Sequence, residues 1–323
     1  MAALVQRIRA RAASLPTFDI PFLLILLLLL SYGLIMLFSA GYAVALYRRG
    51  DAYTYIRPQL LFAALGVLAM YAASLVDYHV WHRLAWPMLG ISLLLLTIVL
   101  FMPEYNGCKR WIVLPGLGTL QPSEIAKFSI VLVFSHIISL NHDRMKSFST
   151  GVVPFALILG VVTVLMLLEP HLSGTLLILS IGAVLMFVGG TGLHWFGLAG
   201  LGLGNSRQKY LYVPEPQNDF IFSILCEELG FIGAALVVAL FLLLLLRGMS
   251  IAVRARDKFG ALLVVGFVVQ VTLQAILNMA VVTNTIPNTG ISLPFFSSGG
   301  TSLLMLLGEM GIVLSVSRQT DMV

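Results

Sequence analysis

The amino-acid sequence predicts an all-α polytopic membrane protein, a bundle of helices that cross a bilayer at least nine times. Hydrophobic residues make up 59% of the 323 residues and charged residues only 10%, whereas soluble domains carry about 25% charged residues. The mean hydropathy is +0.99. Apolar runs also recur at about 20 residues, the length of a helix that crosses a hydrocarbon core about 30 Å thick. Because backbone groups in lipid must be satisfied within the segment, these runs are expected to be helices.

The predicted spans follow one another along the whole chain. They lie at about residues 20–40, 58–76, 83–102, 122–140, 151–168, 173–193, 219–246, 259–283 and 300–317. No low-complexity linker or soluble domain interrupts them. Residues 1–323 are therefore expected to form a single integral membrane domain.

The basic residues conflict with nine crossings. Arg7, Arg9 and Arg11 place the N-terminus in the cytoplasm by the positive-inside rule. Six spans then bring the chain back to the cytoplasm, so that the span beginning at Asp219 would run outward. The basic loop at 247–258 would then lie outside, against the same rule.

One more crossing between about 193 and 218 would move that loop inside. Residues 193–204 are too few and too rich in glycine for a full span. We therefore expect that a tenth span belongs between Gly200 and Leu201 and is missing from this sequence.

Several classes of function are disfavoured by composition. The net charge is +5, but the basic residues are scattered through short loops, without a basic run interleaved with aromatic residues. Nucleic-acid binding is therefore not expected. Cys108 and Cys226 form neither a CxxC pair nor a disulfide framework. No HExxH or carboxylate–histidine spacing occurs, so no dedicated metal site is predicted.

With ten crossings, four polar clusters fall on the outer face. The first holds Lys109, Arg110 and Trp111, followed by a helix start that carries Glu124 and Lys127. The last two are three residues apart and share a helix face. A self-neutralising pair beside an interfacial tryptophan is an equally good interpretation. Ionisable groups inside a span, however, cost about 2.5–3.5 kcal/mol on insertion scales and usually line a cavity.

The second and third clusters follow later spans. Residues 169–175, EPHLSGT, are more typical of a tight turn that caps the next helix. Arg207 and Lys209 could hold an anionic headgroup or lie in an ordinary solvated loop. Asp219 stands where loop becomes helix, so the more favoured interpretation is an N-cap. A carboxylate close to cations could instead act as a general base.

The fourth cluster, residues 284–301, mixes prolines, glycines and hydroxyl groups with apolar side chains and includes Ser297 and Gly299. Such a segment cannot span as a regular helix and predicts a re-entrant or cavity-lining loop. In the preceding span, Gln274 and Asn278 are four residues apart and are expected to hold helices together.

In this order the clusters resemble the SEDS family (FtsW, RodA and SpoVE), bacterial proteins of cell shape, elongation, division and sporulation. The matching stretches are NGCKRW with QPSEIAK, EPHLSGT, GLGNSRQKYLYVPEPQNDFIF with EELGFIG, and NTGISLPFFSSGGTSLL. The resemblance covers about residues 20 to 317 and is closer in motif detail to FtsW or SpoVE than to RodA. Members of the family have ten spans, with a large outer loop after the seventh, which agrees with the charge argument.

The resemblance implies a peptidoglycan glycosyltransferase that polymerises lipid II into glycan strands and releases undecaprenyl pyrophosphate. Asp219 matches the proposed catalytic aspartate, which would accept a proton from the acceptor hydroxyl. The histidine in EPHLSGT replaces the family's acid, so it should not inherit that role. Residues expected to bind substrate are Lys109, Arg110, Trp111, Glu124, Lys127, Arg207, Lys209, Ser297 and Gly299.

The resemblance also implies a metal ion, a partner protein and a cellular location. A divalent cation, Mg²⁺ or Mn²⁺, could share the pyrophosphate charge, and a class B penicillin-binding protein is the implied partner. The expected location is the bacterial cytoplasmic membrane, with both termini in the cytoplasm and the cavity facing outward. Two alternatives stay open: a lipid II flippase and a non-catalytic scaffold of the division or elongation complex.

Overall fold

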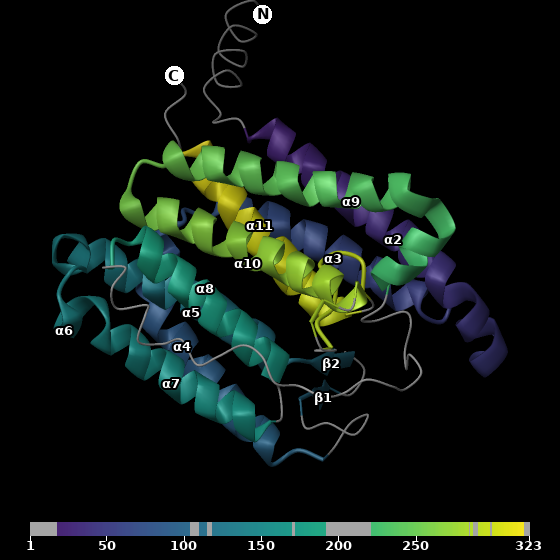
Figure 1. The fold of residues 1–323 in the computed structure, drawn as a ribbon, viewed down its shortest axis with the longest axis horizontal. Coiled ribbons are helices and arrows are strands. Elements are labelled where there is room, and N and C mark those ends of the chain that lie inside the picture. Colours follow the sequence, from purple (N-terminus) through teal and green to yellow (C-terminus); the bar gives the residue numbers. More distant parts are fainter. Residues whose placement is uncertain are drawn as a thin grey trace, which may run out of the picture.

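The structure is a computed structural model that describes residues 18–103, 110–114, 118–169, 172–191, 221–283, 285–286, 290–297 and 299–319. The described chain is a bundle of long helices that lie side by side (Figure 1). The long helices are α2 (Ile20–Arg49), α3 (Ile56–Leu75), α4 (His79–Leu100), α5 (Pro122–Asn141), α7 (Val153–Leu168), α8 (Leu172–Val188), α9 (Ile221–Val253), α10 (Lys258–Val282) and α11 (Gly300–Arg318). The short elements are β1 (Ile112–Leu114), β2 (Gly118–Leu120), η1 (His142–Arg144) and α6 (Phe148–Gly151).

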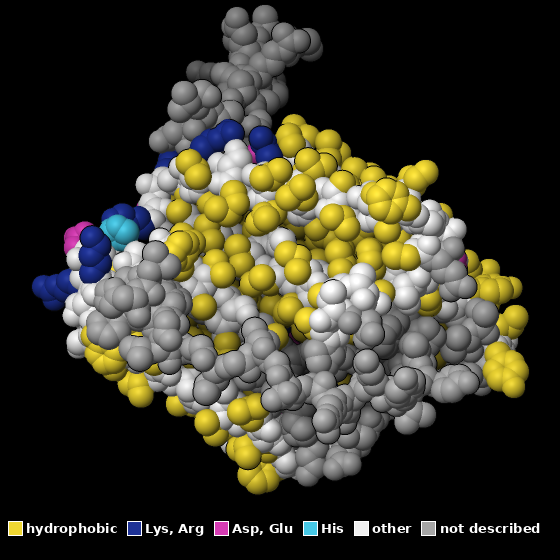
Figure 2. Space-filling view, viewed as in Figure 1, with side chains coloured by type: hydrophobic (Ala, Val, Ile, Leu, Met, Phe, Trp, Pro, Cys, Tyr) yellow, Lys and Arg dark blue, Asp and Glu magenta, His cyan; other side chains and the backbone are white. Residues whose placement is uncertain are grey.

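Each predicted span coincides with a helix, and the all-α polytopic class is confirmed. Within the described ranges, eight helices are long and apolar enough to cross a membrane, while the apolar part of α8, Gly174–Val188, is shorter. The apolar runs were sufficient to place the helices because each must satisfy its own backbone in lipid. Figure 2 shows hydrophobic side chains spread over the middle of one face, where lipid chains would contact them.

Two helix shapes differ from the prediction. α2 continues nine residues beyond position 40 and stops at Gly50, whose φ of 70° is the left-handed conformation of a helix C-cap. α9 contains a break at Gly230, with φ 62° and ψ −160°. Apolar composition marks the lipid-crossing part of a helix but marks neither a polar extension nor a kink.

The two ends of the described chain meet at one end of the bundle, here called the termini end. Asp19 caps α2 by accepting from Phe22 N at 2.9 Å, and its own backbone N–H donates to Ser317 Oγ at 3.3 Å. Arg247 of α9 also donates to the Asp19 carboxylate at 2.8 Å. The opposite end carries the hairpin of β1 and β2 and is called the hairpin end (Figure 1).

α8 and α9 run in the same direction, although they follow one another in the sequence. Thr191, just after α8, donates to the Gly151 carbonyl oxygen at 3.3 Å at the termini end. Near the start of α9, Glu228 accepts from Ser39 Oγ, from the C-terminal half of α2, at 2.7 Å. Thr191 and the start of α9 therefore lie at opposite ends of the bundle (Figure 1).

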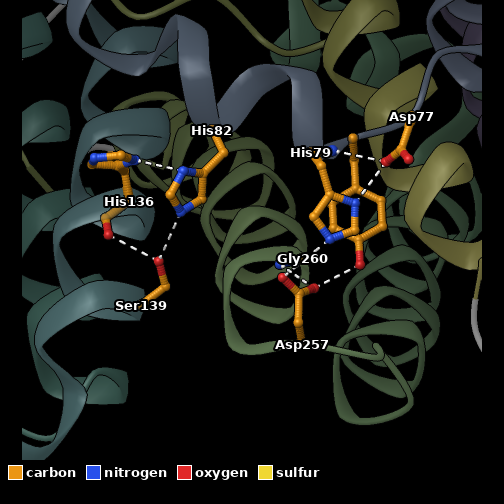
Figure 3. A network of polar contacts seen from close by, with 8 residues as sticks. Asp77, His79, His82, His136, Ser139, Asp257 and Gly260 are labelled. Atoms are coloured by element: carbon orange, nitrogen blue, oxygen red, sulfur yellow. Dashed lines mark hydrogen bonds and ion pairs between the residues drawn. The ribbon is translucent and has the colours of Figure 1, made fainter.

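Polar contacts fasten the turns at the termini end (Figure 3). Asp257 caps α10 by accepting from Gly260 N at 3.2 Å and also accepts from Tyr78 Oη at 2.6 Å. Burial, and then the Asp257 carboxylate, raise the pKa of the Tyr78 hydroxyl. His82 and His136 approach to 3.0 Å between ring nitrogens and join α4 to α5. The α3–α4 and α9–α10 turns are thus held together.

α3 and α11 approach closely through glycines. A Cβ atom added to Gly311 would fall on the Met70 backbone carbonyl oxygen, and one added to Gly66 would meet the Leu307 side chain. Small residues at helix contacts are typical of membrane bundles, because close packing replaces the missing hydrophobic driving force.

Gly311→Ala should therefore destabilise the bundle by about 1–3 kcal/mol, the usual cost of overpacking, because the obstructing atom is backbone and cannot rotate away. Thermal unfolding in detergent measures the effect. Gly308→Ala is the matched control, since an added Cβ there meets nothing within 4 Å. Equal shifts in Tm for the two variants would show that the close approach of α3 and α11 is unimportant.

Candidate functional site

A non-helical segment, residues 290–297, returns into the bundle at the hairpin end between α10 and α11. Asn278 Nδ2 donates to the Ile291 carbonyl oxygen at 2.6 Å, and Gln274 Nε2 donates to the Ser292 carbonyl oxygen at 3.1 Å. On the other side, Gln59 of α3 donates to the Ser297 carbonyl oxygen at 3.2 Å. Buried side-chain amides thus satisfy backbone groups that no helix satisfies, as a cavity-lining loop requires.

An ion pair lies beneath this loop. Glu124 is in the first turn of α5, where the helix dipole favours a carboxylate. Its Oε2 is 2.8 Å from Lys127 Nζ, and the side chains are only 9% and 4% exposed. Lys127 also donates to Gln274 Oε1 of α10 at 3.0 Å. The predicted common helix face is therefore present, and it points into the bundle rather than toward solvent.

A cavity of about 40 Å³ reaches this ion pair. It is lined by Gln121, Ser123, Glu124, Lys127, Gly174, Leu177, Gln274, Gly290, Ile291 and Ser292. The lining combines charges, amides and backbone from α5, α8, α10 and the 290–297 segment. Such a cavity can present a cation to a group that enters from the hairpin end, or it can accept a proton from that group.

Glu169 and Arg110 are a second set of ionisable groups at this end. Glu169 follows the last residue of α7 and is 1% exposed. Burial raises the pKa of its carboxyl group to about 8, and the positive charge of Arg110 opposes the shift. Arg110 precedes the hairpin, which is tied to α11 by a hydrogen bond from Thr301 Oγ1 to the Thr119 carbonyl oxygen at 2.7 Å.

The raised pKa predicts how stability should depend on pH. The unfolded chain releases the Glu169 proton near pH 4.5, whereas the folded protein keeps it to about pH 8. The contribution of the protonated Glu169 carboxyl group to folding stability is therefore fully present below pH 4.5 and is lost as pH rises through 8. Tm measured in detergent should therefore fall from pH 5 to pH 9, and Glu169→Gln should flatten that slope. An unchanged slope in Glu169→Gln would assign the pH dependence to other groups.

The predicted site residues fall into two groups. Asp219, Lys109, Arg207 and Lys209 lie outside the residues that the structure describes. The other predicted site residues are described, and they all lie at the hairpin end, where Glu124 and Lys127 form their ion pair. They are Arg110, Trp111, Glu124, Lys127, Ser297 and Gly299.

Ser297 and Gly299 have structural contacts. Ser297 Oγ accepts from Leu293 N at 2.8 Å, which closes a turn of the loop. Gly299 is the N-cap of α11, and its N–H donates to the Ser297 carbonyl oxygen at 2.9 Å. Both residues line a separate small pocket that shares Ser292 with the cavity at the ion pair. These contacts orient the loop beside the cavity.

Two buried carboxylates, Glu169 and Glu309, were not among the predicted site residues, although Glu169 belongs to the second polar cluster. Glu309 of α11 is 2% exposed and accepts from Gln270 Nε2 at 2.9 and 3.1 Å. The available signal was a lone carboxylate in an otherwise apolar span, which is by default a functional candidate. For Glu169 the signal was a charge at the boundary between two spans.

A multi-pass helical membrane protein with buried charges beneath a non-helical loop fits the class of integral membrane enzymes and transporters. The model of the FtsW/RodA/SpoVE family, described as cell cycle protein, matches residues 20–199 and 195–322. The chain belongs to this family.

Its relatives match along almost their whole length. The probable peptidoglycan glycosyltransferase FtsW of Trichlorobacter lovleyi is 33% identical, with 94% of each chain covered. Stage V sporulation protein E of Bacillus subtilis is 36% identical, with 93% of this chain and 97% of the relative covered. The solved rod shape determining protein RodA of Thermus thermophilus is 29% identical, with a TM-score of 0.78 over 95% of this chain and 98% of that one.

A chain of a solved peptidoglycan synthase complex is 26% identical, with a TM-score of 0.80 over 94% of this chain and 99% of that one. The sequence alignments are longer than the part of this chain that they cover. The match to the Trichlorobacter protein has 358 positions, whereas 94% of 323 residues is about 304. About 54 aligned positions (358 less 304) therefore have no counterpart in this chain.

Proposed function

We propose that this protein is a peptidoglycan glycosyltransferase that polymerises lipid II into glycan strands during bacterial cell division or cell-shape growth. The observation that carries the proposal is the family match along nearly the whole chain, to relatives named as probable peptidoglycan glycosyltransferases. The buried charges at the hairpin end fit this chemistry, because a lipid-borne pyrophosphate would arrive at a membrane surface and requires cations.

The proposed reaction divides its work between a base and cations. Asp219 would accept the proton of the acceptor sugar hydroxyl as that oxygen attacks the anomeric carbon of the donor. The bond from that carbon to the pyrophosphate oxygen breaks, and undecaprenyl pyrophosphate leaves. Lys127 is the described cation best placed to meet a phosphate group, because it lines the cavity and is held by Glu124 and Gln274.

Trp111 and the remaining cations complete the proposed binding surface. Arg110 stands beside the hairpin near Glu169, and Lys109, Arg207 and Lys209 would add positive charge for the pyrophosphate. Within the described ranges no three His, Cys, Asp or Glu side chains cluster as metal ligands. A Mg²⁺ or Mn²⁺ ion would share the charge of the pyrophosphate.

We also propose that the functional fold has ten spans, with the seventh belonging between Gly200 and Leu201. Three observations support this. α8 and α9 run in parallel, both ends of the described chain lie at the termini end, and the alignments contain about 54 positions absent here. The two family matches overlap at 195–199, close to the expected position. Sequencing the gene across this position would show whether about fifty further codons are present.

The proposed location is the bacterial cytoplasmic membrane, with the termini end in the cytoplasm. The Lys and Arg side chains visible in Figure 2 gather toward the termini end, as the positive-inside rule requires. A class B penicillin-binding protein is the proposed partner, which is consistent with the similarity to a chain from a peptidoglycan synthase complex.

The polymerisation assay uses the purified protein together with its class B penicillin-binding protein and lipid II in detergent. Glycan strands should appear and should be resolved by gel electrophoresis. A lipid II flippase remains an alternative, because the buried polar side chains of α10 reach the middle of the bundle. Translocation of lipid II in vesicles without strand synthesis would favour the flippase, and neither activity would favour a scaffold.

A further inference from the structure

Glu309 occupies an unusual setting for a carboxyl group. It lies near the middle of α11, is 2% exposed, and both its oxygens accept from one donor, Gln270 Nε2. Among the described residues no cation forms an ion pair with it. A buried carboxylate without a paired cation costs several kcal/mol, so a proton on Glu309 is the simplest way to remove the charge.

The Gln270 amide, which faces Glu309, also lacks a hydrogen bond. Gln270 is fully buried, and its Oε1 has no hydrogen-bond partner among the described atoms. A carboxylic acid and a primary amide can form two reciprocal hydrogen bonds, O–H to amide oxygen and amide N–H to acid oxygen. Protonation of Glu309, with a rotation of the Gln270 amide, would satisfy the acid and the amide oxygen together.

This pair is linked to the proposed site through α10. Gln270 and Gln274 are one turn apart, and Gln274 accepts from Lys127 Nζ at 3.0 Å. Lys127 and Glu124 of α5 are the charged groups that interact electrostatically with Glu309. A negative charge on Glu309 would attract Lys127 and repel Glu124, whereas a neutral acid leaves their ion pair undisturbed.

We propose that Glu309 is a positioning residue, held by Gln270 as a neutral carboxylic acid, which fixes the α10 face on which Gln274 holds Lys127. The role in catalysis rests on the glycosyltransferase function proposed above. The protonation of Glu309 does not.

Infrared difference spectra of the wild type and Glu309→Gln, both at pH 7 in detergent, test the protonation. The C=O stretching band of a protonated carboxylic acid should be lost in the variant. Glu228→Gln is the matched control, because Glu228 accepts from Ser39 Oγ and is exposed, and it should leave that band unchanged. A band unaffected by Glu309→Gln would overturn the neutral-acid assignment.

Lipid II polymerisation tests the positioning role. Glu309→Leu, which cannot accept from Gln270, should lower kcat by about tenfold to a hundredfold through misplacement of Lys127. Glu309→Gln should restore most of that loss and keep the wild-type pH profile, because a neutral amide replaces a neutral acid. A Gln variant as impaired as the Leu variant, or one with a shifted pH profile, would show that Glu309 acts as an anion.

A third measurement is independent of activity. The Tm changes of Glu309→Leu and Lys127→Met should not add in the double variant, because residues in one hydrogen-bond network are coupled. Additive changes would overturn the positioning role even if the Leu variant were poorly active. If the wild type made no strands, the glycosyltransferase proposal would fail, while the spectra and the Tm coupling would still decide this inference.

Discussion

Asp219→Asn should abolish glycan-strand synthesis while lipid II binding persists. The substitution keeps the size and polarity of the side chain but removes its ability to accept a proton from the acceptor hydroxyl. General-base catalysis contributes about 10²–10⁴-fold to rate, so residual synthesis should fall below one per cent of the wild type. Strand formation on gels and binding of labelled lipid II measure the two properties separately.

Asp51→Asn is the matched control for this prediction. Asp51 is a partly exposed carboxylate at the hairpin end, and it pairs with Arg57 at 3.1 Å on the surface. Its loss should leave synthesis within about twofold, because surface ion pairs contribute little. Unimpaired polymerisation by Asp219→Asn would rule out the general-base role, and loss of binding would indicate a structural N-cap instead.

Removing one partner of the Glu124–Lys127 pair should be strongly destabilising. Lys127→Met leaves Glu124 buried without its cation, and Glu124→Gln leaves Lys127 with an amide only. Breaking a buried pair from one side costs about 3–5 kcal/mol. The double variant should lose less free energy of unfolding than the two single variants lose together, because no unpaired charge remains. Unfolding in mixed micelles measures each free energy.

Exposed Asp51 and Arg57 supply the comparison pair. The single and double variants Asp51→Asn and Arg57→Met should give an interaction free energy of about 0–1 kcal/mol for this pair. Polymerisation separates stability from function, since the Glu124→Gln, Lys127→Met double variant should regain stability without regaining synthesis. A double variant that makes strands at the wild-type rate would remove Lys127 from the proposed pyrophosphate site.

Much of this fold was predictable, because lipid imposes one solution on each long apolar run. The hairpin of β1 and β2 was not predicted, since its strands are three residues long and depend on contacts such as Thr301 with Thr119. The site was predictable where residues are close in sequence, as with Glu124 and Lys127. The partners Gln274 and Gln270 come from another helix, and no periodicity specifies which polar side chains of two helices will meet.

The parallel course of α8 and α9 has a consequence for biogenesis. Spans that enter a membrane one after another during synthesis alternate in direction, so α9 would be threaded opposite to its direction in the folded bundle. The α9–α10 turn, with Arg254, Arg256 and Lys258, would then be exported. The proposed tenth span would give α9 its direction in the bundle, because it adds one more crossing between α8 and α9. Labelling of a cysteine placed in that turn, from outside intact cells, would reveal chains threaded the wrong way.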